Sequence, residues 1–371
     1  MTAEREIAGF ALPFAAGTAI SLVFPHLCFS HPHPALSLSL ATLCVCLTIL
    51  LRSSRKEYPT AFLWTAVIIA AFSCGTLCRI GTEWLSICGQ NFGKSLMTYI
   101  EPSGSRLKEL ISSLPFKDGQ TNALINSLIT GDRSGLDVQT KDIFRTSGAS
   151  HILALSGMHL GIVYGILKLL LSPIGNSRTA KTARSVIAIT VCLFYTLMTG
   201  SSPSIVRAFI FILLYETASI SGRGGKTGEI LMVSLVIQLI LCPEDIEDVG
   251  FQMSYAAMAG IAFIYPKLNR MWPNDSNGVV LKGLKWVWTS ASLAIACQIA
   301  TGPIAYAYFG TFPEYFLLTN LMAAPLVGLI IPWGLAVIVL SAAGICPQIL
   351  ISGLEFIVQT FTGILENISM L

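Results

Sequence analysis

Apolar runs of membrane-spanning length recur along this 371-residue sequence, and they restrict its fold more than any other feature. A helix needs about 20 apolar residues to cross a bilayer. Runs near this length occupy residues 7–28, 35–51, 59–79, 150–172, 184–200, 203–220, 228–242, 249–266, 285–307, 314–343 and 346–367. Only 12% of residues are charged, against about 25% in soluble domains. The sequence therefore predicts an all-α polytopic membrane protein with about 10–12 transmembrane helices.

Lysine and arginine are distributed so that they orient the chain. Every second loop is basic, with Arg52, Arg55 and Lys56, then Arg178, Lys181 and Arg184, then Arg223 and Lys226, then Lys267, Arg270, Lys282 and Lys285. The intervening connections 201–203 and 243–248 contain no basic residue. Because basic loops stay in the cytoplasm, we expect segment 80–150 and the start of the next span on the external face of the membrane.

The external segment has the pattern of surface helices. Apolar residues at helical spacing predict an amphipathic helix over 84–112, and two shorter helices are predicted over 119–129 and 137–146. Ser134 or Asp137 could cap the last of these, and Gly148 could end it. We expect these helices to lie on the outer membrane surface or partly to re-enter it. They separate an N-terminal three-helix membrane segment (1–79) from a larger transmembrane domain (120–371), with 80–119 as an external amphipathic segment.

Polar and charged residues gather where the span near 150–172 begins. Such a cluster is costly in hydrocarbon and is a functional-site candidate. On one continuous helix over 150–170, His151, Ser156 and His159 would share an arc, while Gly157, Gly161 and Gly165 would form a smooth opposite face for close helix packing. A simpler interpretation is that both histidines only bond to neighbouring helices. Asp132 and Arg133 precede this span and could pair or cap a turn.

Catalytic and metal-binding patterns are weak. Ser156 and His159 could suggest a hydrolase, but no histidine follows His159, and a pair on one helix has an unusual geometry for nucleophilic catalysis. The run Gly222–Thr227 lacks the leading glycine of a phosphate-binding loop, because Ile220 stands there. The histidines His26, His31 and His33 suit a loop at the interface, and the ten cysteines form no C-x-x-C pair. We expect no enzymatic activity, no cofactor and no metal.

Several separated motifs occur in one order. The first is Gly131-Asp132-Arg133-Ser134, followed by Phe144-Arg145, Ser147-Gly148, Ser150-His151 and Leu155-Ser156-Gly157-Met158-His159. Further along come Gly200–Ala208, Asp248–Tyr255 with Gly250-Phe251-Gln252, and finally Gly302-Pro303, Phe309-Gly310, Thr319-Asn320 and Pro325. Over residues 120–345 this series resembles the ComEC competence-domain family.

The resemblance implies an inner-membrane channel that passes single-stranded DNA inward during natural transformation, with 120–371 as the channel domain. It implies that Asp132, Arg133 and Arg145 shape the external entrance, that His151, Ser156 and His159 line the upper path, and that Arg207, Gln252 and Asn320 complete a central constriction. Full-length members carry an external OB-like domain and a metallo-β-lactamase-like domain. This sequence has neither the strand pattern nor an H-x-H-x-D-H motif, so we expect a short member.

A short member would need partners besides the lipid bilayer. A separate nuclease and a cytoplasmic helicase or DNA-receptor protein would supply the missing steps, and a second copy of the chain could be required for a wide enough channel. Two other functions stay open. Helices broken near Gly302-Pro303 and at Pro325 or Pro332 would suit a small-solute secondary transporter, and a paralogue without accessory domains could be a non-conducting scaffold.

Overall fold

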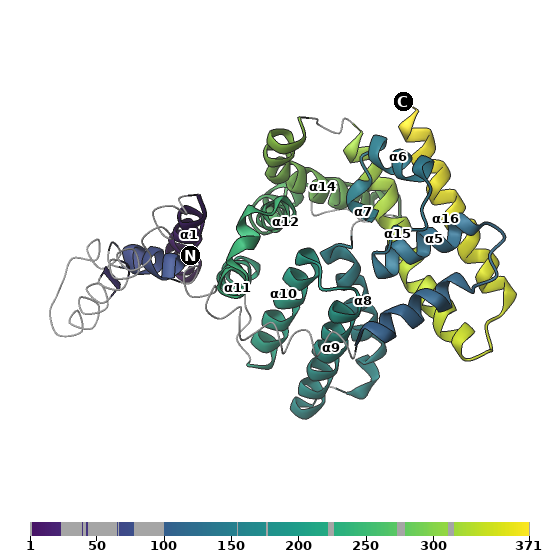
Figure 1. Ribbon diagram of the computed structural model, residues 1–371, viewed down its shortest axis with the longest axis horizontal. Coiled ribbons are helices and arrows are strands. Elements are labelled where there is room, and N and C mark those ends of the chain that lie inside the picture. The colour runs from purple at the N-terminus through teal and green to yellow at the C-terminus, as the bar shows by residue number, and fades with distance from the viewer. Residues whose placement is uncertain are drawn as a thin grey trace.

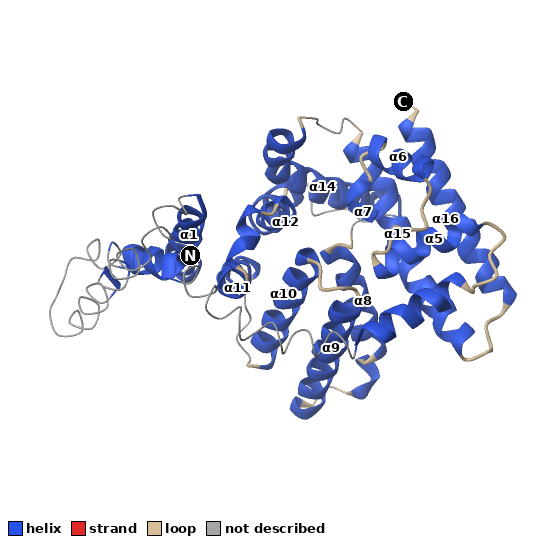
Figure 2. Cartoon of the chain, viewed as in Figure 1, coloured by secondary structure: helices blue, strands red, loops and turns tan. Residues whose placement is uncertain are grey.

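The protein is helical throughout the part that the structure describes. The computed structural model describes residues 2–23, 39, 42–43, 65, 67–77, 100–153, 155–175, 177–221, 226–272, 279–310 and 315–370, and none of these residues is in a strand (Figure 2). The all-α prediction is confirmed. Only residues 39, 42 and 43 of the expected span 35–51 are described. Outside the described ranges lie His26, His31 and His33, together with residues 84–99 of the expected amphipathic helix.

Six helices in the described ranges are long and apolar enough to cross a membrane. They are α8 with its 3₁₀ extension η1 (Gly157–Ile174), α9 (Arg178–Met198), α10 (Pro203–Ile220), α14 (Val279–Phe309), α15 (Phe316–Ala342) and α16 (Gln348–Ser369). Shorter apolar helices cover Gly9–Ala19 in α1 (Thr2–Val23), Val67–Leu77, and α11 (Thr227–Leu241). The chain is therefore a multi-pass membrane protein, while the total of about 10–12 spans stays a prediction.

The run 249–266 is not one regular α-helix. It comprises α12 (Val249–Ala259), a π-helical turn η3 (Gly260–Ile264) and α13 (Tyr265–Asn269). At Gly260 an added Cβ would stand 2.4 Å from the carbonyl oxygen of Ala296 in α14. The backbones of η3 and α14 are thus in direct contact at the π-helical turn.

The two helices expected to break at proline are continuous. Pro303 lies inside α14, and Pro325 and Pro332 lie inside α15. Membrane helices tolerate proline when neighbouring helices compensate for the freed backbone groups. One side of α15 is deeply buried through both prolines, at Ala323, Val327, Ile330 and Ile331. The expectation of half-helices, on which the transporter alternative depended, is wrong for these segments.

The two short helices predicted over 119–129 and 137–146 are both present. Helix α5 (Gly119–Thr130) begins after Asp118, and α6 (Val138–Thr146) begins after Asp137, and each aspartate accepts a backbone N–H of its helix. Gly131 and Gly148 follow the two helices at φ +81° and +78°, a conformation that favours glycine. Residues 100–112 are also helical.

These segments cover the α15–α16 hairpin along much of its length. One apolar core joins Ile111, Leu128 and Phe144 to residues from Ala323 to Ile338 in α15 and from Ile351 to Leu365 in α16. Fifteen residues of helix correspond to about 22 Å, so the contact is not confined to one end of the hairpin. The buried carboxylate of Glu355 in α16 accepts the backbone N–H groups of Lys117 (2.8 Å) and Asp118 (3.2 Å), which precede α5.

Five helices form a closed ring of contacts. Helix α8 packs on α10, α10 on α12, α12 on α14, α14 on α15, and α15 on α8 again (Figure 1). Helix α9 packs on α8 and α10, α1 packs on α11, and α5, α6 and α16 pack together beside α15. The candidate site lies where helices of this ring begin.

Candidate functional site

The loop after α5 is fixed by an ion pair. Lys108 Nζ lies 2.8 Å from Asp132 Oδ2, and the other Asp132 oxygen accepts the Ser134 N–H at 3.0 Å. The Lys108 ammonium and the Ser134 hydrogen bonds hold the pKa of the Asp132 carboxyl well below its usual range. Both side chains are partly exposed. Asp132 thus connects the helix over 100–112 to the loop that carries the Gly131–Ser134 motif.

Residues 150–170 are not one helix, which corrects the sequence expectation. Helix α7 (Ser150–Leu153) ends before Ser156, and α8 begins at Gly157. Ser156 is the N-cap of α8, with an extended backbone at φ −117° and ψ 169°. Arg133 Nε donates to the carbonyl of Leu153 at 2.9 Å, which satisfies an acceptor at the end of α7. The predicted common arc of His151, Ser156 and His159 therefore does not exist.

His159 instead serves the first turn of α8. Its Nδ1 accepts the Ser156 N–H at 3.1 Å and lies 3.0 Å from Ser156 Oγ, so the ring takes the place that Glu or Gln has in a capping box. Since Nδ1 is an acceptor, the proton of the neutral ring is on Nε2. That Nε2 is fully buried, and it makes no hydrogen bond within the described part of the chain.

His151 connects α7 to the beginning of α15. Its Nδ1 lies 3.2 Å from the Gly148 carbonyl oxygen, and its Nε2 lies 3.1 Å from Asn320 Oδ1. The neighbouring Thr319 donates to the Ser147 carbonyl at 2.6 Å. The structure thus brings two predicted site residues, His151 and Asn320, into direct contact. Arg145, on α6, is exposed.

Arg207 is buried in the first turns of α10. The residue is 2% exposed, Nη2 donates to the Gly250 carbonyl at 2.8 Å, and Cζ lies 5.5 Å from the centre of the Phe251 ring. Nε and Nη1 have no hydrogen-bond partner among the residues that the structure describes. Buried arginine donors are normally satisfied, so these two are an exception. Gln252, one turn into α12, donates to the Ile246 carbonyl at 2.9 Å.

The glycines of α8 differ from one another. An added Cβ at Gly157 would lie 3.2 Å from the Ala208 side chain in α10, whereas at Gly161 and Gly165 it would meet no described atom within 4 Å. The expected three-glycine packing face is therefore reduced to its first member. Gly157 allows the beginning of α8 to approach α10 closely.

These contacts connect four helix beginnings in series. Gly157 starts α8 and meets Ala208 near the start of α10. Arg207 binds the first turn of α12, and His151, in the short helix α7 that precedes α8, binds Asn320, the fifth residue of α15. The N-terminus of a helix carries about half a positive charge. The arrangement can therefore attract anionic groups, and Arg207 adds a full positive charge to it.

A second polar cluster, which the sequence motifs do not predict, lies toward the opposite ends of α8 and α10. Glu216 of α10 is fully buried and accepts hydrogen bonds from Tyr164 and Ser185 and an ion pair from Lys168 Nζ at 2.8 Å. Lys168 and Glu216 could have been identified from the sequence, because both are ionisable residues within predicted spans, and such residues normally pair with each other or with another polar group. The cluster joins α8, α9 and α10.

Comparison with known proteins places the chain in a family. Residues 128–371 match the family described as Competence protein. The chain is 20% identical to ComE operon protein 3 of Bacillus subtilis (strain 168) over 67% of its own length and 30% of that protein. It is 25% identical to the uncharacterized protein YcaI of Escherichia coli (strain K12) over 70% and 34%, respectively. The chain spans about a third of the length of these curated relatives.

No solved structure matches the chain. The family match covers more than half of the sequence, and it includes α6 to α16 and hence every helix of the ring and every predicted site residue. This multi-pass membrane protein belongs to the Competence protein family.

Proposed function

We propose that this protein takes part in DNA uptake for competence and conducts a single DNA strand inward across the inner cell membrane, without an enzymatic step of its own. The observation that carries the proposal is a series of contacts that links the beginnings of α8, α10, α12 and α15 within a closed ring of helices, in which the buried Arg207 joins α10 to α12. A DNA strand presents a phosphate every few ångströms, and helix N-termini and arginine are the groups that bind phosphate.

Two sets of unpartnered donors support an anionic substrate. Nε and Nη1 of Arg207 and Nε2 of His159 are buried without acceptors, and a phosphate oxygen would satisfy such groups. A single buried guanidinium also suits passage, because a site along a conduction path must bind weakly enough to release. A set of several arginines would hold the strand in place.

The other predicted residues take roles around this centre. In the proposed orientation, segment 80–150 is external. The entrance is then formed by Asp132, Arg133 and Arg145. His151 and Asn320 lie between this entrance and Arg207. Ser156 and His159 hold the beginning of α8, and Gln252 holds the beginning of α12. The proposal divides the chain into 1–79, 80–119 and a channel domain, 120–371. A nuclease and a cytoplasmic helicase or DNA receptor would be separate partners.

The test is strand passage in proteoliposomes made with the full chain. Arg207→Gln and Arg207→Lys would be compared with wild type and with Arg270→Gln, whose arginine is exposed after α13. The measured quantity is the amount of fluorescent oligonucleotide protected from external nuclease, with single- and double-stranded probes. We expect single strands to enter, Arg207→Gln to reduce entry about tenfold through loss of a charge-assisted contact, Arg207→Lys to be intermediate, and Arg270→Gln to match wild type.

Two results would oppose the proposal. If the folded wild-type protein admits no strand, the chain is a scaffold or depends on a partner for conduction. If Arg207→Gln and Arg270→Gln give equal entry, Arg207 does not lie on the path, and the cluster of helix beginnings serves only to hold the fold.

A further inference from the structure

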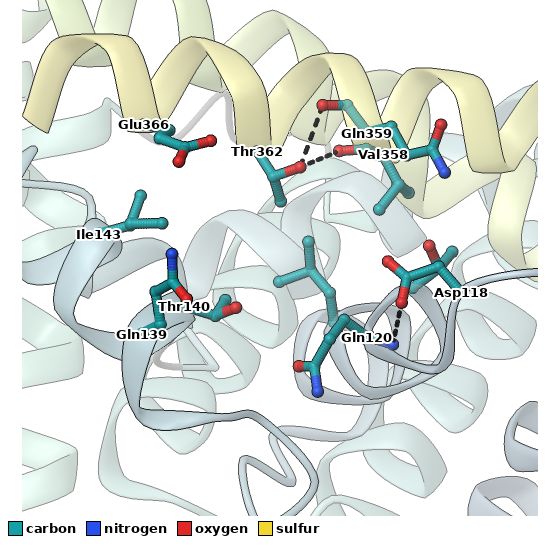
Figure 3. Close-up of a pocket in the computed structure, with 11 residues that line it drawn as sticks. Asp118, Gln120, Gln139, Thr140, Ile143, Val358, Gln359, Thr362 and Glu366 are labelled. Atoms are coloured by element: carbon teal, nitrogen blue, oxygen red, sulfur yellow. Dashed lines mark hydrogen bonds between the residues drawn. The ribbon is translucent and has the colours of Figure 1, made fainter.

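A pocket of about 190 Å³ lies between α5, α6 and α16, away from Arg207 and the predicted path (Figure 3). Figure 3 shows Asp118 and Glu366 at opposite sides of this pocket, with Gln139 and Thr140 below and Gln359 and Thr362 above. Side chains of α5 and α6 face those of α16 across it. None of these lining residues was singled out by the sequence motifs.

The pocket carries negative charge and has no compensating cation among the described residues that line it. Its charged groups are Asp118 and Glu366, and its amides are Gln120, Gln139 and Gln359. One Asp118 oxygen accepts the Gln120 N–H at 3.0 Å, and neither carboxylate belongs to an ion pair found in the described part of the chain. Thr121 also lines the pocket; it is 1% exposed, and its Oγ1 has no hydrogen-bond partner.

The composition of the walls excludes several ligand classes. An anion would meet two carboxylates and no basic group. A nucleobase or a sugar ring would find no aromatic side chain to stack on among the lining residues. A single metal ion needs several ligands around one point, whereas the two carboxylates lie on opposite sides, and no group of three metal-binding side chains occurs in the described ranges.

The separation of the two acidic residues along α16 favours an elongated cation. Asp118 N lies 3.2 Å from the carboxylate of Glu355, and Glu366 is eleven residues further along α16, or about 16 Å of helix. Leu124, Ile143 and Val358 provide apolar wall between the two charged ends. A ligand that fits has ammonium groups at its ends and methylene groups between them.

We propose that this pocket binds a linear aliphatic polyamine. One terminal ammonium pairs with Asp118 and the other with Glu366, amide and hydroxyl oxygens accept from the amines, and the methylene groups lie on Leu124, Ile143 and Val358. A triamine such as spermidine spans the pocket better than a diamine such as putrescine. The proposal does not depend on DNA passage, because the pocket is built by other helices than the Arg207 cluster.

The experiment is calorimetric titration of the full chain in nanodiscs of zwitterionic lipid, which do not attract cations by themselves. The probes are spermidine, putrescine and Mg²⁺. We expect saturable spermidine binding, weaker putrescine binding, and an affinity for spermidine about tenfold lower in Asp118→Asn and in Glu366→Gln, since each loses a charge-assisted bond. Asparagine retains the N-cap of α5. The matched control Glu109→Gln removes an exposed carboxylate outside the pocket and should bind as wild type.

A thermal unfolding scan of each variant accompanies the titration, so that loss of binding is separated from loss of fold. Spermidine should raise the unfolding temperature of wild type and of Glu109→Gln, but not of the two pocket variants. The proposal is overturned if spermidine binding is not saturable, if all three variants weaken it equally, or if putrescine binds as tightly. Mg²⁺ displacing spermidine at equal concentration would assign the pocket to a hydrated divalent cation instead.

Discussion

Buried polar side chains in this membrane protein fall into two kinds, which differ in whether their hydrogen bonds are complete. Glu216 is buried, and its carboxylate is matched by Tyr164, Lys168 and Ser185. Arg207 and His159 are as deeply buried, but part of their donors have no acceptor. A complete network stabilises a fold, whereas an incomplete one costs free energy unless a ligand completes it. The Glu216 network therefore stabilises the bundle, whereas the incomplete bonds of Arg207 agree with the proposed contact to a phosphate group.

The Glu216 network leads to a prediction about pairs of substitutions. Lys168→Met leaves a buried carboxylate without its cation and should destabilise the protein by roughly 3 kcal/mol. Glu216→Gln leaves a lysine whose side chain is 41% exposed, which can be solvated, so the cost should be about 1 kcal/mol. The double variant should be more stable than Lys168→Met alone. Thermal unfolding in one detergent measures all four proteins.

Additive effects of the two substitutions would mean that Lys168 and Glu216 do not interact. The network would then be held by Tyr164 and Ser185 alone, and the assignment of Lys168 to it would be wrong.

The Asp132–Lys108 pair predicts a dependence of stability on pH. The pKa of Asp132 is lowered in the folded protein, first by Lys108, so its contribution is present above the unfolded pKa of about 4 and is lost as pH falls toward the folded pKa. Both side chains are partly exposed, which limits the contribution to about 1 kcal/mol or less. Wild type should exceed Asp132→Asn in unfolding temperature between pH 5 and 8, and the difference should shrink below pH 4.

If the difference in unfolding temperature between wild type and Asp132→Asn grows as the pH falls, the Lys108–Asp132 ion pair is not its cause. High salt should also reduce the difference at neutral pH, because exposed ion pairs are screened.

Part of the site could be predicted from residue types alone. Polar residues at the start of a span identify His151, His159 and Arg207, because burying them has to be compensated. The partners could not be predicted: His151 meets Asn320, which is 169 positions away, and no local pattern specifies that contact. Glu216 and Lys168 lie on different spans, and only the packing of α8 against α10 shows that they form one network.

At the scale of elements, the sequence predicts where short helices begin, but it does not predict the break between α7 and α8. Asp137 is one of the two residues predicted to cap the helix over 137–146, and α6 begins directly after it. Asp118 caps α5 in the same way. The break between α7 and α8 lies within an apolar run, Ile152 to Leu155, so hydropathy continues across it. The break depends on Ser156 and His159 capping α8 and on Arg133 binding the Leu153 carbonyl, and the last contact is made by a residue from outside the run.

The cap of α8 predicts an order of stability for substitutions at His159. Gln is a standard residue at this position of a capping box, so His159→Gln should retain the bond to the Ser156 N–H and lose little stability. His159→Ala removes it and leaves a cavity, and should cost about 1–2 kcal/mol. Unfolding temperature measures both, and hydrogen exchange at residues 156–160 should increase in His159→Ala and stay near wild type in His159→Gln. Equal losses in the two variants would show that the ring, and not the cap, is required.

At the scale of the whole molecule, the closed ring is the feature that sequence could not give. Hydropathy predicts spans and basic loops predict their direction, but neither says which spans touch. The contact of α15 with α8 closes the ring across more than 140 positions of sequence. The covering of α15 and α16 by α5 and the helix over 100–112 likewise depends on matching apolar faces from distant segments.

The last prediction concerns the orientation of this ring in the membrane. The proposed direction of DNA passage depends on that orientation. Glu247, in the acidic 3₁₀ turn η2 (Pro243–Glu247), and Arg270, after α13, are both exposed and flank α12 to α13 on opposite sides. In a cysteine-free background Glu247→Cys should react with a membrane-impermeant maleimide in intact cells, and Arg270→Cys only after permeabilisation, because basic loops remain cytoplasmic. The reverse pattern would place Asp132 and the beginnings of α8, α10, α12 and α15 in the cytoplasm. An incoming strand would then reach Arg207 last, and the proposed entrance would be the exit.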